Sequence, residues 1–282
     1  MDNINWVSLP IVGALSFQKL LNSQKLQNVM RCLHLWNLEG MSILQLPRIK
    51  HLRSLTIYRC GELQDIKVNL ENERGRRGFV ADYIPNSIFY NLQIVCVDKL
   101  PKLLDLTWII YIPSLEHLSV HECESMKEVI GDASGVPKNL GIFSRLKGLY
   151  LYLVPNLRSI SRRALSFPSL KTLYVTKCPN LRKLPLDSNS ARNSLKTIEG
   201  TLEWWQCLQW EDESIQLTFT PYFKETSWLG KNEKMTFFSD AFSGTAFFFG
   251  TKFQMSHVFS CSKFLKSKII LKINMHVRDG FN

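Results

Sequence analysis

The sequence lacks the features of a secreted or membrane-spanning protein. Its 282 residues contain no Asn-x-Ser/Thr glycosylation acceptor, and Met1–Pro10 has neither the charged nor the long apolar segment of a signal peptide. No apolar stretch reaches the ~18 residues that cross a bilayer. The nearest, Phe237–Phe249, is too short and contains Asp240. The sequence therefore predicts a protein of the cytoplasm without a transmembrane segment.

Catalytic and metal-binding motifs are also missing. There is no H-E-x-x-H, G-x-S-x-G, protein-kinase or dinucleotide-binding pattern. The seven cysteines form no C-x-x-C pair, and we interpret them as reduced thiols. His117 and His121 are four residues apart, but they fall on a predicted strand and the start of a loop rather than on one helix face. We predict no enzyme, no cofactor, no metal site and no small-molecule substrate.

The positive charge is spread unevenly along the chain. The net charge is +11, and residues 226–282 contain eight Lys/Arg against three Asp/Glu. Such a balance can indicate nucleic acid or an anionic membrane as a partner. The one basic run, Arg74, Arg76 and Arg77, is short, and no nucleic-acid-binding motif accompanies it. We therefore predict no nucleic-acid partner.

A repeated pattern of apolar residues dominates what the sequence does contain. The template L-x-x-L-x-L-x-x-(C/L)-x-x-L-x-x-(L/I) occurs six times, with six apolar anchors in each copy. All 36 anchor positions are apolar, although only 45% of the chain is hydrophobic. The copies begin at Met30, Leu52, Leu92, Leu115, Leu146 and Leu170.

Each copy predicts one short strand followed by a turn back. The L-x-L core, such as Leu55-Thr56-Ile57, alternates with a period of two, and the later anchors are three residues apart. One unit cannot bury its own apolar face, so the units must stack around one continuous core. The predicted fold class is an α/β solenoid. It is a leucine-rich-repeat horseshoe or arc, with short parallel strands on the concave face and an irregular or 3₁₀ convex side.

Three cysteines occupy the same offset of the repeat, just past the strand. They are Cys60, Cys123 and Cys178. We interpret them as small buried hydrophobic residues with a weak S–H donor, in preference to a redox or metal role.

The pattern divides the chain into four predicted segments. Residues 1–25 form a partial N-terminal repeat, 26–200 the leucine-rich repeats, 201–225 an atypical Trp-rich C-terminal cap, and 226–282 a basic, disordered or irregular tail outside the repeat. Trp204, Trp205 and Trp210 are expected to cover the last core layer, with a ligand site as the alternative. The pattern begins mid-repeat, so we expect the chain to be part of a longer protein.

Two polar stretches interrupt the repeat spacing. Residues 69–88 and 131–141 are rich in turn-forming residues and are predicted to be surface loops. They are either contact sites on a rigid scaffold or tolerated insertions.

The end of the repeat region resembles a known family. It contains CPNLRKLP at 178–185, LKTIEG at 195–200, WW at 204–205, WED at 210–212 and FTPYF at 219–223. Together with LNSQKLQ at 21–27, these segments resemble the C-terminal leucine-rich repeats of coiled-coil-type plant NB-LRR (NBS-LRR) disease resistance proteins. The resemblance covers about residues 4–225. The G-x-I-P signature of extracellular plant repeats is missing, which favours the intracellular class.

The resemblance implies a protein-recognition module of an intracellular plant immune receptor. Such a module senses a pathogen effector, directly or through a guarded host protein, and makes an autoinhibitory contact with an NB-ARC-type nucleotide-binding domain. The G-x-x-x-x-G-K-[ST] phosphate loop of that domain is absent from this chain, which therefore cannot switch on ATP or ADP alone. The alternative is a generic leucine-rich-repeat adaptor, such as a substrate-recognition subunit of a ubiquitin ligase. An upstream F-box-like segment would favour it, and this sequence has none.

Candidate partner-binding residues lie between and just after the strand anchors, where side chains are predicted to point to the concave, solvent side. Tyr, Trp and Arg are typical of interface hot spots, whereas an ordinary solvated face is the alternative for each residue taken singly. The candidates are His34, Trp36, Tyr58, Arg59, Asp98, His121, Tyr150, Tyr152, Tyr174 and Lys177.

Overall fold

The computed structural model describes most of the predicted repeat region. The described residues are 6–9, 21–23, 27–28, 30–68, 89–131, 141–162, 165, 167–187, 189–191 and 193–226. Most of the predicted partial repeat at 1–25, the predicted loop at 69–88, most of the predicted loop at 131–141 and the tail after Thr226 lie outside them.

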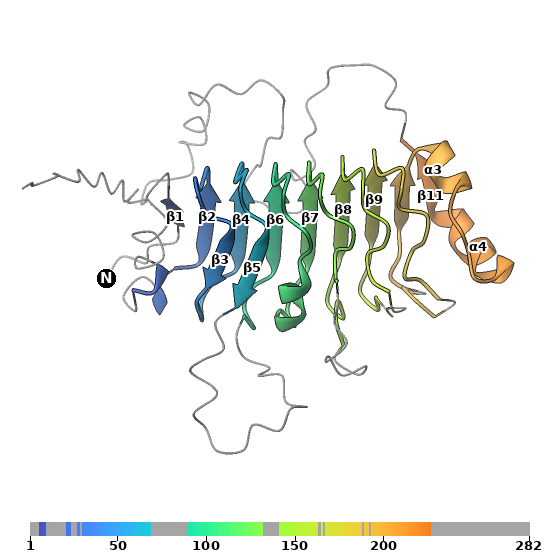
Figure 1. The fold of residues 1–282 in the computed structure, drawn as a ribbon. Coiled ribbons are helices and arrows are strands. Elements are labelled where there is room, and N and C mark those ends of the chain that lie inside the picture. The colour runs from blue at the N-terminus through green and yellow to red at the C-terminus, as the bar shows by residue number, and fades with distance from the viewer. Residues whose placement is uncertain are drawn as a thin grey trace, which may run out of the picture. The chain divides into compact units, whose positions relative to one another are not determined.

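One parallel sheet of nine strands runs through these residues. Its strand order is β1-β2-β4-β6-β7-β8-β9-β10-β11, and Figure 1 shows the strands side by side in one row. The strands are β1 (Trp6–Leu9), β2 (Cys32–Trp36), β4 (Ser54–Tyr58), β6 (Ile94–Asp98), β7 (His117–His121), β8 (Gly148–Tyr152), β9 (Thr172–Thr176), β10 (Thr197–Gly200) and β11 (Phe223–Glu225).

Six strands of this sheet, β2, β4, β6, β7, β8 and β9, are the predicted L-x-L segments of the six repeats. Equivalent anchors are register partners: Leu33 pairs with Leu55, and Leu55 with Val95. All 36 anchors are buried, which confirms the period assigned to the sequence. One strand per repeat, stacked in parallel, is the arrangement of a repeat or solenoid-like α/β fold.

The side opposite the main sheet is only partly the irregular or 3₁₀ arc predicted from the sequence. A 3₁₀ helix, η2 (Thr107–Tyr111), follows the third repeat strand. The first two repeats instead form a second parallel sheet of β3 (Ile43–Leu46) and β5 (Asp65–Val68). These repeats are adjacent and 22 residues apart, so their return segments run in register and can pair.

Side-chain hydrogen bonds tie neighbouring repeats together outside the strands. Asn156 donates to the carbonyl of Glu124 at 2.8 Å, and Asn180 donates to that of Pro155 at 2.7 Å. The rings of Phe143 and Phe167, which precede β8 and β9, stack with centroids 5.7 Å apart. Polar and aromatic contacts thus repeat with the same period as the anchors.

The last core layer is covered by two short helices and a final strand. Helix α3 (Leu202–Gln206), helix α4 (Glu213–Phe219) and the 3₁₀ turn η3 (Thr220–Tyr222) follow β10 in the chain, and Figure 1 shows the two helices at the end of the sheet, next to β11. Thr201 and Asp212 cap the helices by accepting from backbone N–H groups two or three residues ahead. Trp204 and Trp205 are buried, and the indole N–H of Trp204 donates to the carbonyl of Leu181 at 2.9 Å.

Candidate functional site

The ten candidate residues occupy three positions of the repeat. His34, Tyr150 and Tyr174 lie between the two strand anchors, and Arg59 and Lys177 directly follow a strand. The remaining five end their strands: Trp36, Tyr58, Asp98, His121 and Tyr152. We call these non-anchor strand positions, with the residues directly before and after each strand, the sheet face.

Strand pairing brings several candidates together. The five strand-end residues are successive register partners on β2, β4, β6, β7 and β8, so they form one row across the sheet. Tyr150 and Tyr174 are partners in the neighbouring row. Register partners on adjacent strands are ~4.8 Å apart, close enough for side-chain contact.

The residue after each of these strands bends the chain in a recurring way. Arg59 and Lys177 have φ of 54° and 56°, and Lys99 and Glu122 have φ of 58° and 49°. Their backbone N–H groups continue the hydrogen bonding between strands. That of Arg59 donates to the backbone carbonyl of Asp98 at 2.9 Å, and that of Lys99 donates to the backbone carbonyl of His121 at 3.1 Å. Left-handed φ is uncommon outside glycine. Its recurrence here shows that the turn is imposed by the repeat.

Tyr58 is the centre of a cationic cluster. Cζ of Arg59 lies 5.0 Å from the centroid of the Tyr58 ring, and Nζ of Lys99 lies 5.7 Å from it. Both are within cation–π range. Lys99 also forms an ion pair with Glu122 at 3.8 Å.

Tyr152 has a similar environment farther along the sheet. Nζ of Lys177 lies 5.3 Å from the Tyr152 ring centroid and donates to its hydroxyl at 3.2 Å. The ring of His121 meets that of Tyr152 edge to face, with centroids 6.1 Å apart. The aromatic groups at this end of the strands are therefore held in place rather than free to rotate.

Three candidates do not face solvent as predicted. Asp98, His121 and Tyr174 are only 3%, 5% and 2% exposed. The prediction was wrong for them because it considered only which face a side chain lies on. Neighbouring strands supply large groups that cover them, such as Tyr152 beside His121. The other seven candidates are half-buried or exposed.

Burial alters the ionisation of three candidate residues on the sheet face: Asp98, His121 and His34. Burial, and then the charge of Glu122, raise the pKa of Asp98 to about 7, against the opposing effects of Lys99 and Arg59. Burial lowers the pKa of His121 and of His34 to about 4, so both imidazoles are neutral at neutral pH. Oδ1 of Asp98 is buried and accepts no hydrogen bond from any residue that the structure describes. The centre of the row is thus poorly solvated, and Asp98 is only partly ionised at neutral pH.

Reasoning from the sequence missed the cations next to the strands. Lys99 follows β6, and a further set directly precedes the strands: Arg31, Arg53, Lys147, Lys171 and Lys196. Because four of that set, all except Lys196, follow the first anchor of a copy, the same template could have located those four.

The three equivalent cysteines are buried as predicted. Their thiols donate to the carbonyl two residues earlier: Cys60 to Tyr58 at 3.5 Å, Cys123 to His121 at 3.2 Å and Cys178 to Thr176 at 3.4 Å. Burial raises the pKa of Cys123 and of Cys178 to about 12. A thiol of that kind acts as a packing group and weak donor at neutral pH.

Neither a metal centre nor a membrane span stands out in the described ranges. No group of three or more His, Cys, Asp or Glu side chains there is arranged to hold a metal ion. Over the same residues, no helix has the length and hydropathy needed to cross a bilayer.

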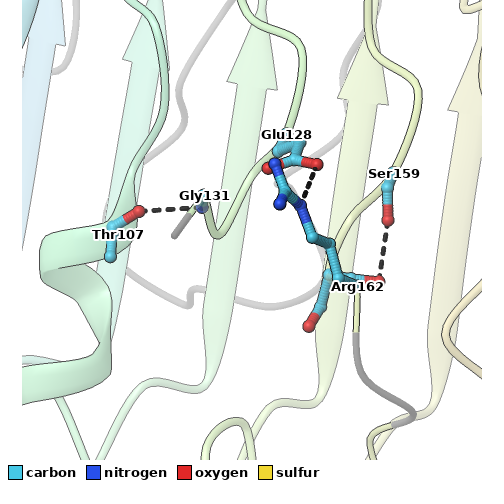
Figure 2. Close-up of polar contacts among 6 residues, drawn as sticks. Thr107, Glu128, Gly131, Ser159 and Arg162 are labelled. Atoms are coloured by element: carbon cyan, nitrogen blue, oxygen red, sulfur yellow. Dashed lines mark hydrogen bonds and ion pairs between the residues drawn. The ribbon is translucent and has the colours of Figure 1, made fainter. Parts of the chain in front are cut away.

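Polar contacts fasten the start of the loop at 131–141 to the repeats on either side. Thr107 Oγ1 accepts from the backbone N–H of Gly131 at 2.8 Å, and Arg162 Nε donates to Glu128 at 2.7 Å (Figure 2). Glu128 also forms an isolated parallel β-bridge with Ser159. Residues 128–131, directly before this segment, are therefore held by contacts to both neighbouring repeats.

Comparison with known proteins assigns the repeats to a family. Residues 77–207 match the family model described as plant disease resistance protein RPS2-like leucine-rich repeats. Two Arabidopsis thaliana relatives are the disease resistance proteins RPS5, 34% identical over 228 residues, and SUMM2, 32% identical over 228 residues. These alignments cover 78% and 77% of this chain, but only 25% and 24% of the relatives. The chain therefore spans about a quarter of their length.

The repeat period, the buried anchors and these relatives all agree. The segments around the tryptophan-rich end resemble the same family, so the resemblance predicted from the sequence is confirmed. The chain belongs to the leucine-rich-repeat region of the plant NB-LRR disease resistance proteins.

Proposed function

We propose that this chain is the non-enzymatic protein-recognition module of an intracellular plant immune receptor. It senses a pathogen effector, directly or through a guarded host protein, and makes an autoinhibitory contact with a nucleotide-binding domain. Membership of the disease resistance family supports a role in defence and a location in the cytoplasm.

The sheet face carries the argument for recognition. Its strands are joined by backbone hydrogen bonds, so its side chains stand on a rigid scaffold. Aromatic groups flanked by cations, as at Tyr58 and Tyr152, are ordered before any partner arrives. Ordered Tyr and Arg side chains lose little conformational freedom on binding, which is why such residues dominate interface energies.

Binding to the nucleotide-binding region of the same receptor tests the autoinhibitory contact. The full chain would be immobilised and exposed to that region in its ADP-bound and ATP-bound states, with binding followed by biolayer interferometry. We expect binding that differs between the two states, because a switch requires differential affinity. Absence of binding in both states would overturn the intramolecular part of the proposal.

Matched substitutions test whether the sheet face makes that contact. Tyr58→Ala removes an aromatic group of the face, whereas Tyr90→Ala removes an exposed tyrosine that is not part of the face. We expect the first to weaken binding by about tenfold or more, as for a hot-spot residue, and the second to leave it unchanged. Equal effects of the two substitutions would contradict a role of the sheet face.

A further inference from the structure

Three lysines occupy equivalent positions directly before β8, β9 and β10. The backbone N–H of Lys171 donates to the carbonyl of Lys147 at 2.8 Å, and that of Lys196 donates to the carbonyl of Lys171 at 2.8 Å. Their Cα atoms therefore follow the spacing of the strands, ~4.8 Å per step. These three residues, which we call the lysine row, lie side by side at the N-terminal ends of the three strands.

The charge of this row is mostly unneutralised. Lys147 pairs with Glu116 at 2.7 Å, but Lys171 and Lys196 have no carboxylate within ion-pair distance among the described residues. Both are exposed. Like charges on adjacent strands repel each other. Solvent screens part of this repulsion, and an anionic group placed over the row would remove the rest.

A glycine allows Tyr150 to approach this row. A Cβ atom on Gly148 would lie 2.7 Å from Cε2 and 2.8 Å from the hydroxyl of Tyr150, so the ring occupies the space that a side chain would need. The same Cβ would lie 2.9 Å from Nδ1 of His117 on the neighbouring strand. The Tyr150 hydroxyl thus lies over the beginning of β8, one residue from Lys147.

The lysines are also close to His117. Burial lowers the pKa of His117, and the charges of Lys147 and Lys171 lower it further against the opposing effect of Glu116. The ammonium groups therefore contribute to the potential over this part of the sheet.

A lysine also lies at the C-terminal ends of these strands. Lys177 follows β9 and bonds the Tyr152 hydroxyl at 3.2 Å. Tyr150 and Tyr152 are both half-buried and lie between lysines at the two ends of the strands. Glu199 is the one carboxylate on the strands β8–β10 themselves.

We propose that the tyrosine–lysine surface of β8–β10 docks an acidic segment of a partner protein. This surface consists of Lys147, Tyr150, Tyr152, Lys171, Lys177 and Lys196. The inference rests on the proposed recognition function and specifies the chemistry of the partner. The carboxylates of an acidic peptide are separate groups that can be positioned away from Glu116 and Glu199. The phosphates of a nucleic acid follow one another continuously, so some of them would lie against these two glutamates and be repelled. The fit therefore favours a peptide over a nucleic acid.

Selection of peptides from a random display library on the full chain tests this inference. We expect the selected peptides to be enriched in Asp and Glu and their affinity to fall as salt rises. Selected peptides that are neutral or basic, or a selection without enrichment, would overturn it. In either case, face-dependent binding to the nucleotide-binding region would still support the proposed function, so the two failures can be told apart.

Matched double variants locate the binding. Lys171→Ala/Lys196→Ala removes two free charges of the row, whereas Lys50→Ala/Lys127→Ala removes two exposed charges elsewhere that likewise form no ion pair among the described residues. We expect the first to lower affinity for the selected peptides by about tenfold and the second to change it by less than about twofold, because close charge pairs depend on position. Equal losses in both variants would show a general charge effect and contradict the surface.

Two controls complete the test. Gly148→Ala should displace Tyr150 and weaken peptide binding while all lysines remain, and thermal unfolding of each variant establishes that it is folded. A single-stranded oligonucleotide of equal charge serves as a competitor. Displacement of the peptide by equal concentrations of the oligonucleotide would assign a nucleic acid to the surface and overturn the proposal.

Discussion

Gly200 and Trp204 are in such close contact that no side chain fits at position 200. A Cβ atom there would lie 2.4 Å from Cε3 of Trp204 and 3.0 Å from the carbonyl oxygen of Val175. Strand β10 thus ends in a glycine because an indole covers its backbone. Trp204 can then reach the carbonyl of Leu181.

Gly200→Ala should therefore destabilise the end of the repeat region. Overpacking a well-packed site costs about 1–3 kcal/mol, and Trp204 would have to leave its position to accommodate the methyl group. Urea unfolding followed by tryptophan fluorescence measures the change. Gly61→Ala is the matched control, because a Cβ at Gly61 meets no atom within 4 Å. Equal unfolding midpoints of the two variants would refute the close contact.

Leu118→Ala should destabilise the centre of the core. Leu118 is an anchor of β7 that is fully buried, and a cavity left by such a truncation costs about 2–5 kcal/mol. Leu104→Ala provides the comparison, because Leu104 is 53% exposed. Calorimetry should show a clear decrease in the melting temperature of the first variant only.

Asp98→Asn should change how stability depends on pH. The folded-state pKa of Asp98 is raised to about 7 from an ordinary value of 3.8, so folding favours the protonated form. Its stabilising contribution is complete below the unfolded-state pKa and is lost as pH rises through about 7. Relative to wild type, the variant should gain stability at pH 8 and lose that advantage toward pH 4.

The buried histidines make a difference measurement necessary for Asp98. The pKa of His34 and of His121 is lowered to about 4, so their contributions are lost as pH falls and oppose that of Asp98. Urea unfolding of wild type and variant at the same pH values separates the two effects. A stability difference that stays constant between pH 4 and pH 8 would show that Asp98 does not titrate in this range.

Cysteine labelling should distinguish the repeat thiols from the one in the cap. Cys207 is exposed, whereas Cys60, Cys123 and Cys178 are buried. At pH 8 in native buffer, we expect iodoacetamide to modify Cys207 and to leave the other three unmodified until the chain is denatured, because the thiolate is the reactive form. Peptide mapping by mass spectrometry identifies the sites. Rapid native labelling of Cys123 would contradict the burial described above.

The core could be predicted residue by residue, because burial of anchors depends on a period that is written in the chain. Leu118 and Val120 are two residues apart, and a strand places such residues on one side whatever follows. The same reasoning identified the offset of Cys60, Cys123 and Cys178 as buried.

The sheet face could be predicted only as a set of positions. Alternation assigned Asp98, His121 and Tyr174 to the correct side of their strands, but their exposure depends on side chains from other repeats. The insertion at 69–88 separates Tyr58 from Asp98 by 40 residues in the chain, yet they are register partners. The pattern within a single repeat does not relate two residues that are so far apart in the chain.

The amino-acid sequence thus sufficed for the repeat, the family and the identity of the buried anchors. The repeat and its anchors follow from spacing within about 15 residues, where backbone geometry alone relates position to side, and the family follows from the resemblance of the segments near the tryptophan-rich end. Folding in three dimensions was needed to show that Tyr150 occupies the space left by Gly148 beside a row of lysines. Strand pairing places residues from separate repeats ~4.8 Å apart. The sizes and charges of these neighbouring side chains then determine which side chains are buried, whose pKa is shifted and which side chains are accessible to a partner protein.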